Sequence, residues 1–260
     1  MIVAFPCPAA APEPNRWAAR PIPRAEHFEN IMSNLRLRQG FIFAIIIIIV
    51  FIGYGLLQYP LIIGESGVSS ILFPVFMLLL YGVAAVWGTY RPSQAHNDAL
   101  MSGTAFGLAV GAIFIITITT ENFVNVSSQI ISISTLGFML IIFLLFASAG
   151  WHGAKKSGQM RLGVFTSVWS AITGVLIALI FGFAINFLFT QRLEQNLQTS
   201  AEYFRSGSHD LETFTFWNTL DSASSHLFEV PIIAAVLGTL GSLISLGFSQ
   251  LRKIFKRSSA

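Results

Sequence analysis

Residues 99–120 read ALMSGTAFGLAVGAIFIITITT, an apolar run in which Gly103, Gly107 and Gly111 recur at every fourth position. Residues four apart lie on one face of an α-helix, so the three glycines form a ridge without bulk along which another helix can lie close. In lipid such ridges are a main device for packing helices, because lipid tails are as apolar as leucine. The stretch therefore predicts a close-packed transmembrane helix.

A second ridge of small residues follows in a later apolar segment. It consists of Thr166, Ser170, Gly174, Ala178 and Gly182, again at steps of four. We interpret both ridges as packing surfaces within one chain. A seam between two copies is the alternative, because small residues serve both kinds of contact. The helix that carries the second ridge is expected at the centre of the bundle.

The composition sets the class of the protein. Of the 260 residues, 54% are hydrophobic and 10% are charged, against about 25% charged in soluble domains. Apolar segments near the roughly 20 residues that cross a bilayer lie at 41–59, 71–90, 99–120, 130–150, 163–189 and 231–248. The sequence thus predicts an all-α membrane protein, a six-span transmembrane helical bundle in residues 41–250.

The basic residues give the expected orientation. In the six-span scheme, 13 of the 15 lysines and arginines fall on one side, and basic residues near span ends favour the cytoplasm. We therefore expect a multi-pass protein of the bacterial cytoplasmic (inner) membrane with both termini in the cytoplasm. Because the net charge of +3 follows the membrane in this way, no nucleic-acid partner is expected.

The segments outside the spans have distinct compositions. Residues 1–40 are proline-rich and are expected to form a disordered tail. A start at Met32 is an equal alternative, with residues 1–31 an overlong start. Residues 251–260 are expected to form a basic cytoplasmic tail.

Residues 190–229 are expected to form one sizeable external loop. Its first part, 193–204, has helical apolar spacing that continues the fifth span. After Asp210, a second helix is expected either to lie in the membrane interface or to pack on the bundle. Pro231 is placed in the first turn of the sixth span.

The second and third spans resemble the fourth and fifth at an offset of about 63 positions, which brings the two ridges into register. A repeat of two spans keeps its membrane orientation, as in parallel transporter repeats. Chance similarity between hydrophobic hairpins is the alternative.

Between the fourth and fifth spans, residues 150–163 read GWHGAKKSGQMRLG. This hairpin resembles those of uncharacterised small bacterial multi-pass membrane proteins, in which glycines flank a basic pair, and the resemblance implies no activity. Lys155 and Lys156 suit an anionic inner leaflet. Gly158 and Gly163 are expected to permit the reversal of the chain.

Few side chains are candidates for catalysis, proton transfer or metal binding. In the predicted spans no ionisable residue lies at mid-depth, so proton relays lack their usual groups. The external histidines and carboxylates, including His209 and His226, show no recognised metal-ligand spacing and are interpreted as a solvated acidic face. No cofactor and no enzymatic activity are expected.

Two functions are consistent with this pattern. The first is a structural or accessory membrane protein that acts through helix packing with itself or with a membrane partner in the lipid bilayer. The alternative is a small permease or channel with a path between spans 2–3 and spans 4–5. Such a protein needs polar side chains around a cavity, for which Thr117, Thr173 and Asn186 are the candidates.

Overall fold

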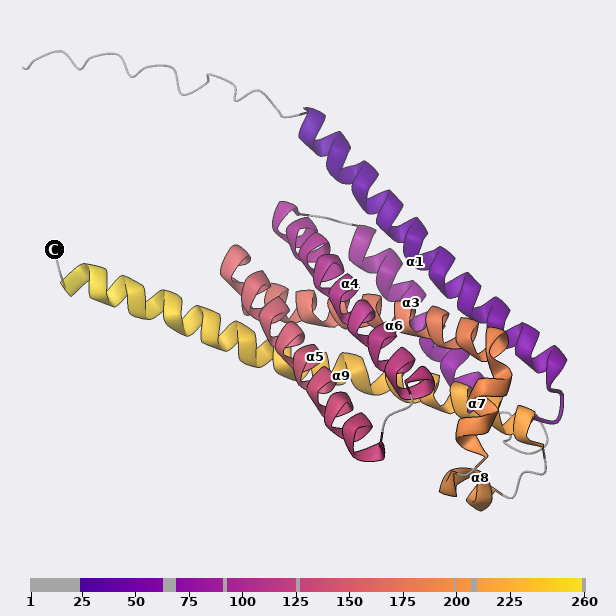
Figure 1. Cartoon of the computed structure of the whole chain (residues 1–260). Helices are drawn as coiled ribbons and strands as arrows, with labels where there is room; N and C mark the ends of the chain where they lie inside the picture. The colour runs from indigo at the N-terminus through magenta and orange to yellow at the C-terminus, as the bar shows by residue number, and fades with distance from the viewer. Residues whose placement is uncertain are drawn as a thin grey trace, which may run out of the picture.

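The computed structural model describes residues 24–62, 69–90, 93–124, 127–198, 200–206 and 210–258. In these residues the regular structure is entirely helical (Figure 1). The long helices are α1 (Arg24–Gln58), α3 (Ser69–Tyr90), α4 (Gln94–Phe123), α5 (Ser128–Ser157), α6 (Met160–Leu188) and α9 (Leu211–Ser258). Two short helices, α7 (Thr190–Leu197) and α8 (Ala201–Ser206), lie between α6 and α9.

Six of these helices are long and apolar enough to cross a membrane. The qualifying segments are Asn34–Gln58, Ser70–Tyr90, Gln94–Phe123, Gln129–Ser157, Met160–Leu188 and Leu211–Leu251. This confirms the predicted all-helical class and the six candidate spans, and with them a multi-pass membrane protein in a lipid bilayer.

The ends of the chain differ from the predicted tails. Helix α1 begins at Arg24, inside the predicted tail 1–40, and α9 continues to Ser258, through most of the predicted tail 251–260. The alternative start concerns residues 1–31, most of which lie outside the described residues. Both helices extend past the apolar segments because a helix satisfies its own backbone hydrogen bonds and can continue beyond the lipid.

The predicted external loop 190–229 is wrong in its second half. Helix α9 begins at Leu211 and runs through Pro231 without a break. Proline has no N–H, so it leaves the carbonyl four residues before it without its helical partner. That carbonyl belongs to Leu227, and the hydroxyl of Tyr81 on α3 donates to it at 2.7 Å. The proline is therefore accommodated inside the helix, and no interfacial helix separate from the last span is present.

The first half of the loop also differs from the prediction. Instead of continuing as one helix, α6 ends at Leu188, and Phe189 leaves helical geometry with φ −132° and ψ 34°. The chain then turns into α7 and α8. Asp210 lies at the start of α9 and accepts from the backbone N–H groups of Glu212 and Thr213 at 3.2 and 3.3 Å.

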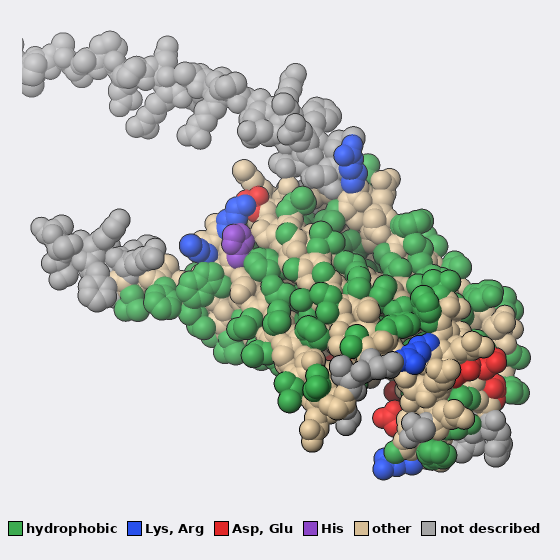
Figure 2. Space-filling view, viewed as in Figure 1, with side chains coloured by type: hydrophobic (Ala, Val, Ile, Leu, Met, Phe, Trp, Pro, Cys, Tyr) green, Lys and Arg blue, Asp and Glu red, His purple; other side chains and the backbone are tan. Residues whose placement is uncertain are grey.

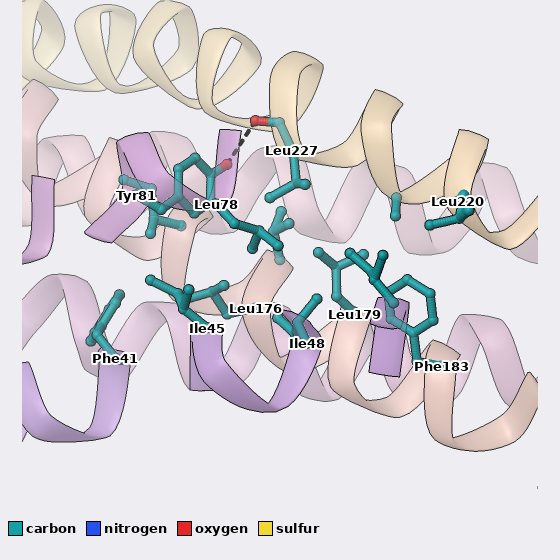
Figure 3. Close-up of a cluster of buried hydrophobic side chains, with 14 of the residues drawn as sticks. Phe41, Ile45, Ile48, Leu78, Tyr81, Leu176, Leu179, Phe183, Leu220 and Leu227 are labelled. Atoms are coloured by element: carbon teal, nitrogen blue, oxygen red, sulfur yellow. Dashed lines mark hydrogen bonds between the residues drawn. The ribbon is translucent and has the colours of Figure 1, made fainter. Parts of the chain in front are cut away.

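Helix α6 lies at the centre of the bundle, between α4, α5 and α9 (Figure 1). The main hydrophobic core gathers around one of its faces, where Leu176, Leu179 and Phe183 meet side chains from α1, α3 and α9 (Figure 3). From α1 come Phe41, Ile45 and Ile48, and from α9 Leu220 and Leu227. The central position expected for the helix with the second ridge agrees with this arrangement.

The glycine ridge on α4 faces the second ridge on α6. A Cβ added at Gly103 would lie 2.8 Å from the Thr166 carbonyl oxygen, and one added at Gly107 would lie 2.8 Å from that of Ser170. At Gly111 the added carbon would lie 2.9 Å from side-chain atoms of Ile177. These separations are shorter than ordinary carbon contacts, so the two backbones approach in a way that only glycine allows.

A second close contact joins α5, α6 and α9. Ser242 on α9 donates to the Gly150 carbonyl at 3.1 Å, and Gly163 packs against the same pair of residues. Gly163 therefore serves helix packing rather than the turn for which it was predicted. The turn residue is Gly158, which ends α5 with φ +69°.

The surface of the bundle has an apolar band with charges at both ends (Figure 2). Helix α5 contributes exposed large side chains at Ile133, Leu136, Leu140 and Leu144. In lipid this exposure carries no penalty, because the surroundings are as apolar as the side chains. The band is the surface expected of a protein embedded in a bilayer.

Candidate functional site

A cavity of about 490 Å³ lies between α4, α5, α6 and α9, at the end of the bundle where α4 ends. Along α4 its lining extends from Asn122 to Phe114, a depth of about 12 Å at 1.5 Å per residue. Its polar lining residues are Thr117, Glu121, Asn122, Thr135, Asn196, Thr215, Asn218, Thr219, Ser222 and His226. Such a concentration of polar groups between spanning helices is the main candidate for a functional site.

Helix α4 supplies the carboxylate of the cavity. Glu121 lies at the exposed mouth, where the hydroxyl of Thr135 on α5 donates to its Oε1 at 2.7 Å. One turn deeper, Thr117 donates its own hydroxyl to the Ile113 carbonyl at 2.9 Å. These polar side chains lie at the cavity because the last two turns of α4 are rich in polar residues.

Helix α9 supplies an ionisable residue well inside the bundle. His226 lines the cavity, and its ring packs against Phe114 with centroids 5.5 Å apart. The next residue, Leu227, is at the level of Tyr81 in the middle of α3. The prediction that no ionisable residue lies at mid-depth of a predicted span rests on an external loop at residue 226, whereas the structure has this residue inside the long helix α9.

Helix α7 contributes to the cavity lining and covers part of the cavity mouth. Arg192 and Asn196 both donate to the Asn122 carbonyl at the end of α4, at 3.3 and 3.1 Å. This carbonyl is one of those that a helix C-terminus leaves without a partner inside the helix. On the inner side of α7, Leu193 and Leu197 line the cavity. The position of α7 thus depends on capping α4.

The floor of the cavity is closed by apolar packing. Ile142, one of its lining residues, belongs to a cluster of buried side chains with Val110, Phe146, Ala171 and Ala234. On α4 and α5 the cluster residues lie about one turn below the lining residues of the cavity, and on α6 and α9 they lie about two turns below them. The cavity therefore ends inside the bundle.

A smaller polar cavity of about 360 Å³ lies at the opposite ends of α4 and α5. It is lined by Gln94, Ala95, Asp98, Ala99, Ser102, Gly153, Lys156 and Ser157. Lys156 and Asp98 form an ion pair across it at 3.1 Å. The two cavities share α4, on which Ser102 and Phe114 are separated by about 18 Å of helix.

Of the three polar residues predicted for a transport site, only Thr117 lines the large cavity. Thr173 is buried against Gly107 and donates to the Trp169 carbonyl at 2.8 Å. Asn186 is 1% exposed and donates to Thr219 at 2.8 Å, so it holds a lining residue from behind the cavity wall.

The predicted ridge residues do not all serve packing. Thr166, Ser170 and Gly174 lie in the contact with α4, but Gly182 differs. A Cβ at Gly182 would meet no atom within 4 Å, and both Gly182 and Ala178 line the large cavity. The four-residue spacing locates a face of the helix but does not reveal where that face turns from a neighbouring helix to a cavity.

The predicted solvated acidic face is only partly described, because His209 lies outside the described residues. Within the described chain, no group of three metal-ligating side chains is found. Comparison with protein-family models, with curated proteins and with solved structures finds no match to this chain.

Acidic side chains gather where α7 meets the start of α9. Burial raises the pKa of Glu194 above its usual value, and the nearby carboxylates of Glu212 and Asp210 raise it further. A raised pKa means that the folded chain holds this proton more tightly than the unfolded chain. The resulting stabilisation is fully present below the unfolded pKa and is lost as pH rises through the folded pKa.

We therefore expect Glu194→Gln to unfold at a higher temperature than the wild type at neutral pH. Near pH 4, about the ordinary pKa of a glutamate, the two proteins should unfold alike. Thermal unfolding in detergent at several pH values checks this. Glu202→Gln on α8 removes the same charge outside this cluster and is the control. An equal gain for both variants would contradict a role for the cluster.

Proposed function

We propose that this protein is a small permease that binds a polar solute in the large cavity and passes it between α4 and α5. The observation that carries the proposal is a cavity between apolar helices that has ten polar residues in its lining. Polar groups within spanning helices are costly and usually face a solute path. The role is non-enzymatic.

The smaller cavity supports a path that crosses the membrane. Both cavities are lined by α4 and α5, and the apolar cluster with Val110 and Phe146 lies between them. The path between the two cavities is therefore closed at mid-depth in this structure. Alternating access would require α4 or α5 to shift relative to α6, so that the apolar cluster opens on one side at a time.

The arrangement of α4 and α6 favours the parallel repeat that the sequence indicates. In that repeat Gly103 corresponds to Thr166, and Gly107 to Ser170. These corresponding residues also contact each other across the bundle. Contact between equivalent positions on two parallel helices is what an axis along the membrane normal produces, so we propose a two-span duplication around it.

We also propose that the large cavity faces the outside, with both termini in the cytoplasm. Described basic side chains at the end where α1 begins are Arg36, Arg38, Lys155, Lys156 and Arg161. Figure 2 shows lysine and arginine side chains gathered at this end of the bundle and most of the acidic side chains at the other. This distribution agrees with the excess of basic residues usual for cytoplasmic loops.

An accessory role is the second candidate. It is favoured by the dry packing at mid-depth, where Ser170 and Thr173 contact α4 rather than a cavity. An apolar groove between α1 and α3 offers a surface to lipid or to a partner helix. In that case the protein would act through contacts with itself or with another membrane protein, and the polar cavity would have no solute.

Cysteine labelling separates the two candidates. In a Cys7→Ser background, which removes the single natural cysteine, Gly182→Cys places a thiol in the open space of the cavity. We expect this thiol to react with a membrane-impermeant maleimide added from outside, because thiols react as thiolates in water. Mass spectrometry of the intact protein measures the extent of reaction.

Two controls make the labelling specific. Gly137→Cys has equally open surroundings but lies on an exposed face of α5 outside the cavity, in the apolar band, and should stay unlabelled. Ser157→Cys, at the other end of α5, should react only after permeabilisation. A Gly182→Cys thiol that stays unlabelled from both sides would show a dry cavity and favour the accessory role.

A further inference from the structure

Four of the five hydroxyl groups that line the large cavity are already committed as donors. Thr117 and Thr215 donate to carbonyls of their own helices, at 2.9 and 2.8 Å. Thr219 donates to the Thr215 carbonyl at 3.1 Å, and Thr135 donates to Glu121. A hydroxyl has one hydrogen, so each of these groups can offer only oxygen lone pairs to a solute.

In its neutral form the histidine also offers an acceptor. Nδ1 of His226 lies 2.7 Å from the Ser222 carbonyl oxygen, which can only accept. Nδ1 must therefore carry the hydrogen, and Nε2 of the neutral ring keeps a lone pair. Asn122 has one amide hydrogen committed to the Ile118 carbonyl at 2.9 Å. The donors left in the lining are uncharged. They are the Ser222 hydroxyl, whose oxygen lies 3.5 Å from Nδ1 of His226, and carboxamide N–H groups, those of Asn218 among them.

The formal charge of the cavity lining is negative, like the partial charge of these lone pairs. Glu121 is the one carboxylate among the lining residues, and no lysine or arginine is among them. Arg192 on α7 is not among the lining residues and donates to the Asn122 carbonyl at the mouth. Phenylalanine rings at Phe114, Phe138 and Phe183 form much of the apolar wall, and aromatic faces attract cations.

We infer that the solute is a small organic cation with N–H donors, an ammonium or guanidinium compound, bound through Glu121 at the mouth and acceptors deeper in the cavity. This inference rests on the proposed function and names its solute class. A cation taken out of water needs both a counter-charge and hydrogen-bond acceptors. An anion would be repelled by the carboxylate of Glu121 and by the lone pairs of the lining.

Three probes that share one four-carbon frame test the solute class. They are 4-amino-1-butanol, which is a cation at neutral pH, 1,4-butanediol, which is neutral, and 4-hydroxybutyrate, which is an anion. Isothermal titration calorimetry of the full-length protein in lipid nanodiscs measures their binding. We expect heat of binding for the ammonium probe alone.

Substitution of the counter-charge supplies the second arm. Glu121→Gln should raise the Kd of the ammonium probe by about tenfold or more, as for loss of a charged hydrogen-bond partner. Glu229→Gln, which removes an exposed carboxylate from α9 outside the cavity lining, should leave the Kd unchanged. This control separates a local contact from the general charge of the protein.

Each other outcome overturns the inference. If the anion or the diol binds as tightly as the amine, the inferred solute class is wrong. Equal Kd values for wild type and Glu121→Gln would show that Glu121 is not the counter-charge. If no probe binds while Gly182→Cys is labelled from outside, the assignment of a cation fails, but a cavity open to water is still supported. If that thiol is not labelled, the proposed function itself fails.

Discussion

Replacing Gly107 with leucine is expected to destabilise the protein by about 3 kcal/mol, the upper part of the range for overpacked cores. The first added carbon would lie 2.8 Å from the Ser170 carbonyl oxygen and closer still to the side chain of Thr173. Backbone atoms of α6 cannot rotate away as a side chain can, so α4 and α6 must separate. The temperature of half-unfolding in mild detergent measures the loss.

Gly137→Leu is the matched control, because a Cβ at Gly137 meets no atom within 4 Å and the position is exposed on α5. Both substitutions gain up to about 1 kcal/mol of helix propensity, so their difference reports packing alone. Size-exclusion chromatography should also show aggregated or unfolded material for Gly107→Leu only. Equal unfolding temperatures for the two variants would contradict the close contact of α4 with α6.

Loss of the Tyr81 hydroxyl is expected to cost about 1 kcal/mol, within the range measured for hydrogen bonds between membrane helices. Tyr81→Phe leaves the Leu227 carbonyl without a donor, because Pro231 cannot supply the helical N–H. The ring of residue 81 stays buried in the same core. Unfolding in detergent by a denaturant series measures the change.

Pro231→Ala tests the cause of that cost. Alanine restores the backbone N–H at position 231, which can donate to the Leu227 carbonyl in the ordinary helical pattern. In this background Tyr81→Phe should cost clearly less than in the wild type. Additive costs in the double-mutant cycle would show that the hydroxyl acts independently of the proline.

The sequence indicated the packing of the bundle better than its polar interior. Gly103, Gly107 and Gly111 repeat at helical spacing, and spacing alone puts them on one face of α4. The same rule grouped Gly182 with a packing ridge, although that glycine opens on the cavity. Periodicity describes one helix at a time, whereas a cavity depends on how several helices diverge.

The largest error concerned the last helix. The sequence predicts Pro231 in the first turn of a span, because proline suits that position. Inside a helix, a proline leaves one carbonyl without its backbone donor. Tyr81, 150 positions earlier in the sequence, supplies the missing donor. As a result α9 begins 20 residues earlier, and His226 moves from an external loop into the bundle. No local pattern in the sequence reports such a partner.

The helical membrane class, the six apolar segments and the small-residue faces can be predicted from the amino-acid sequence. They follow from hydropathy, length and helical spacing, which are properties of consecutive residues. The folded structure was needed to show that α9 passes through Pro231, that α7 caps α4, and that Glu121 and His226 line one cavity. Each of these depends on a hydrogen bond or a gap between helices distant in the sequence, where geometry rather than composition selects the neighbours.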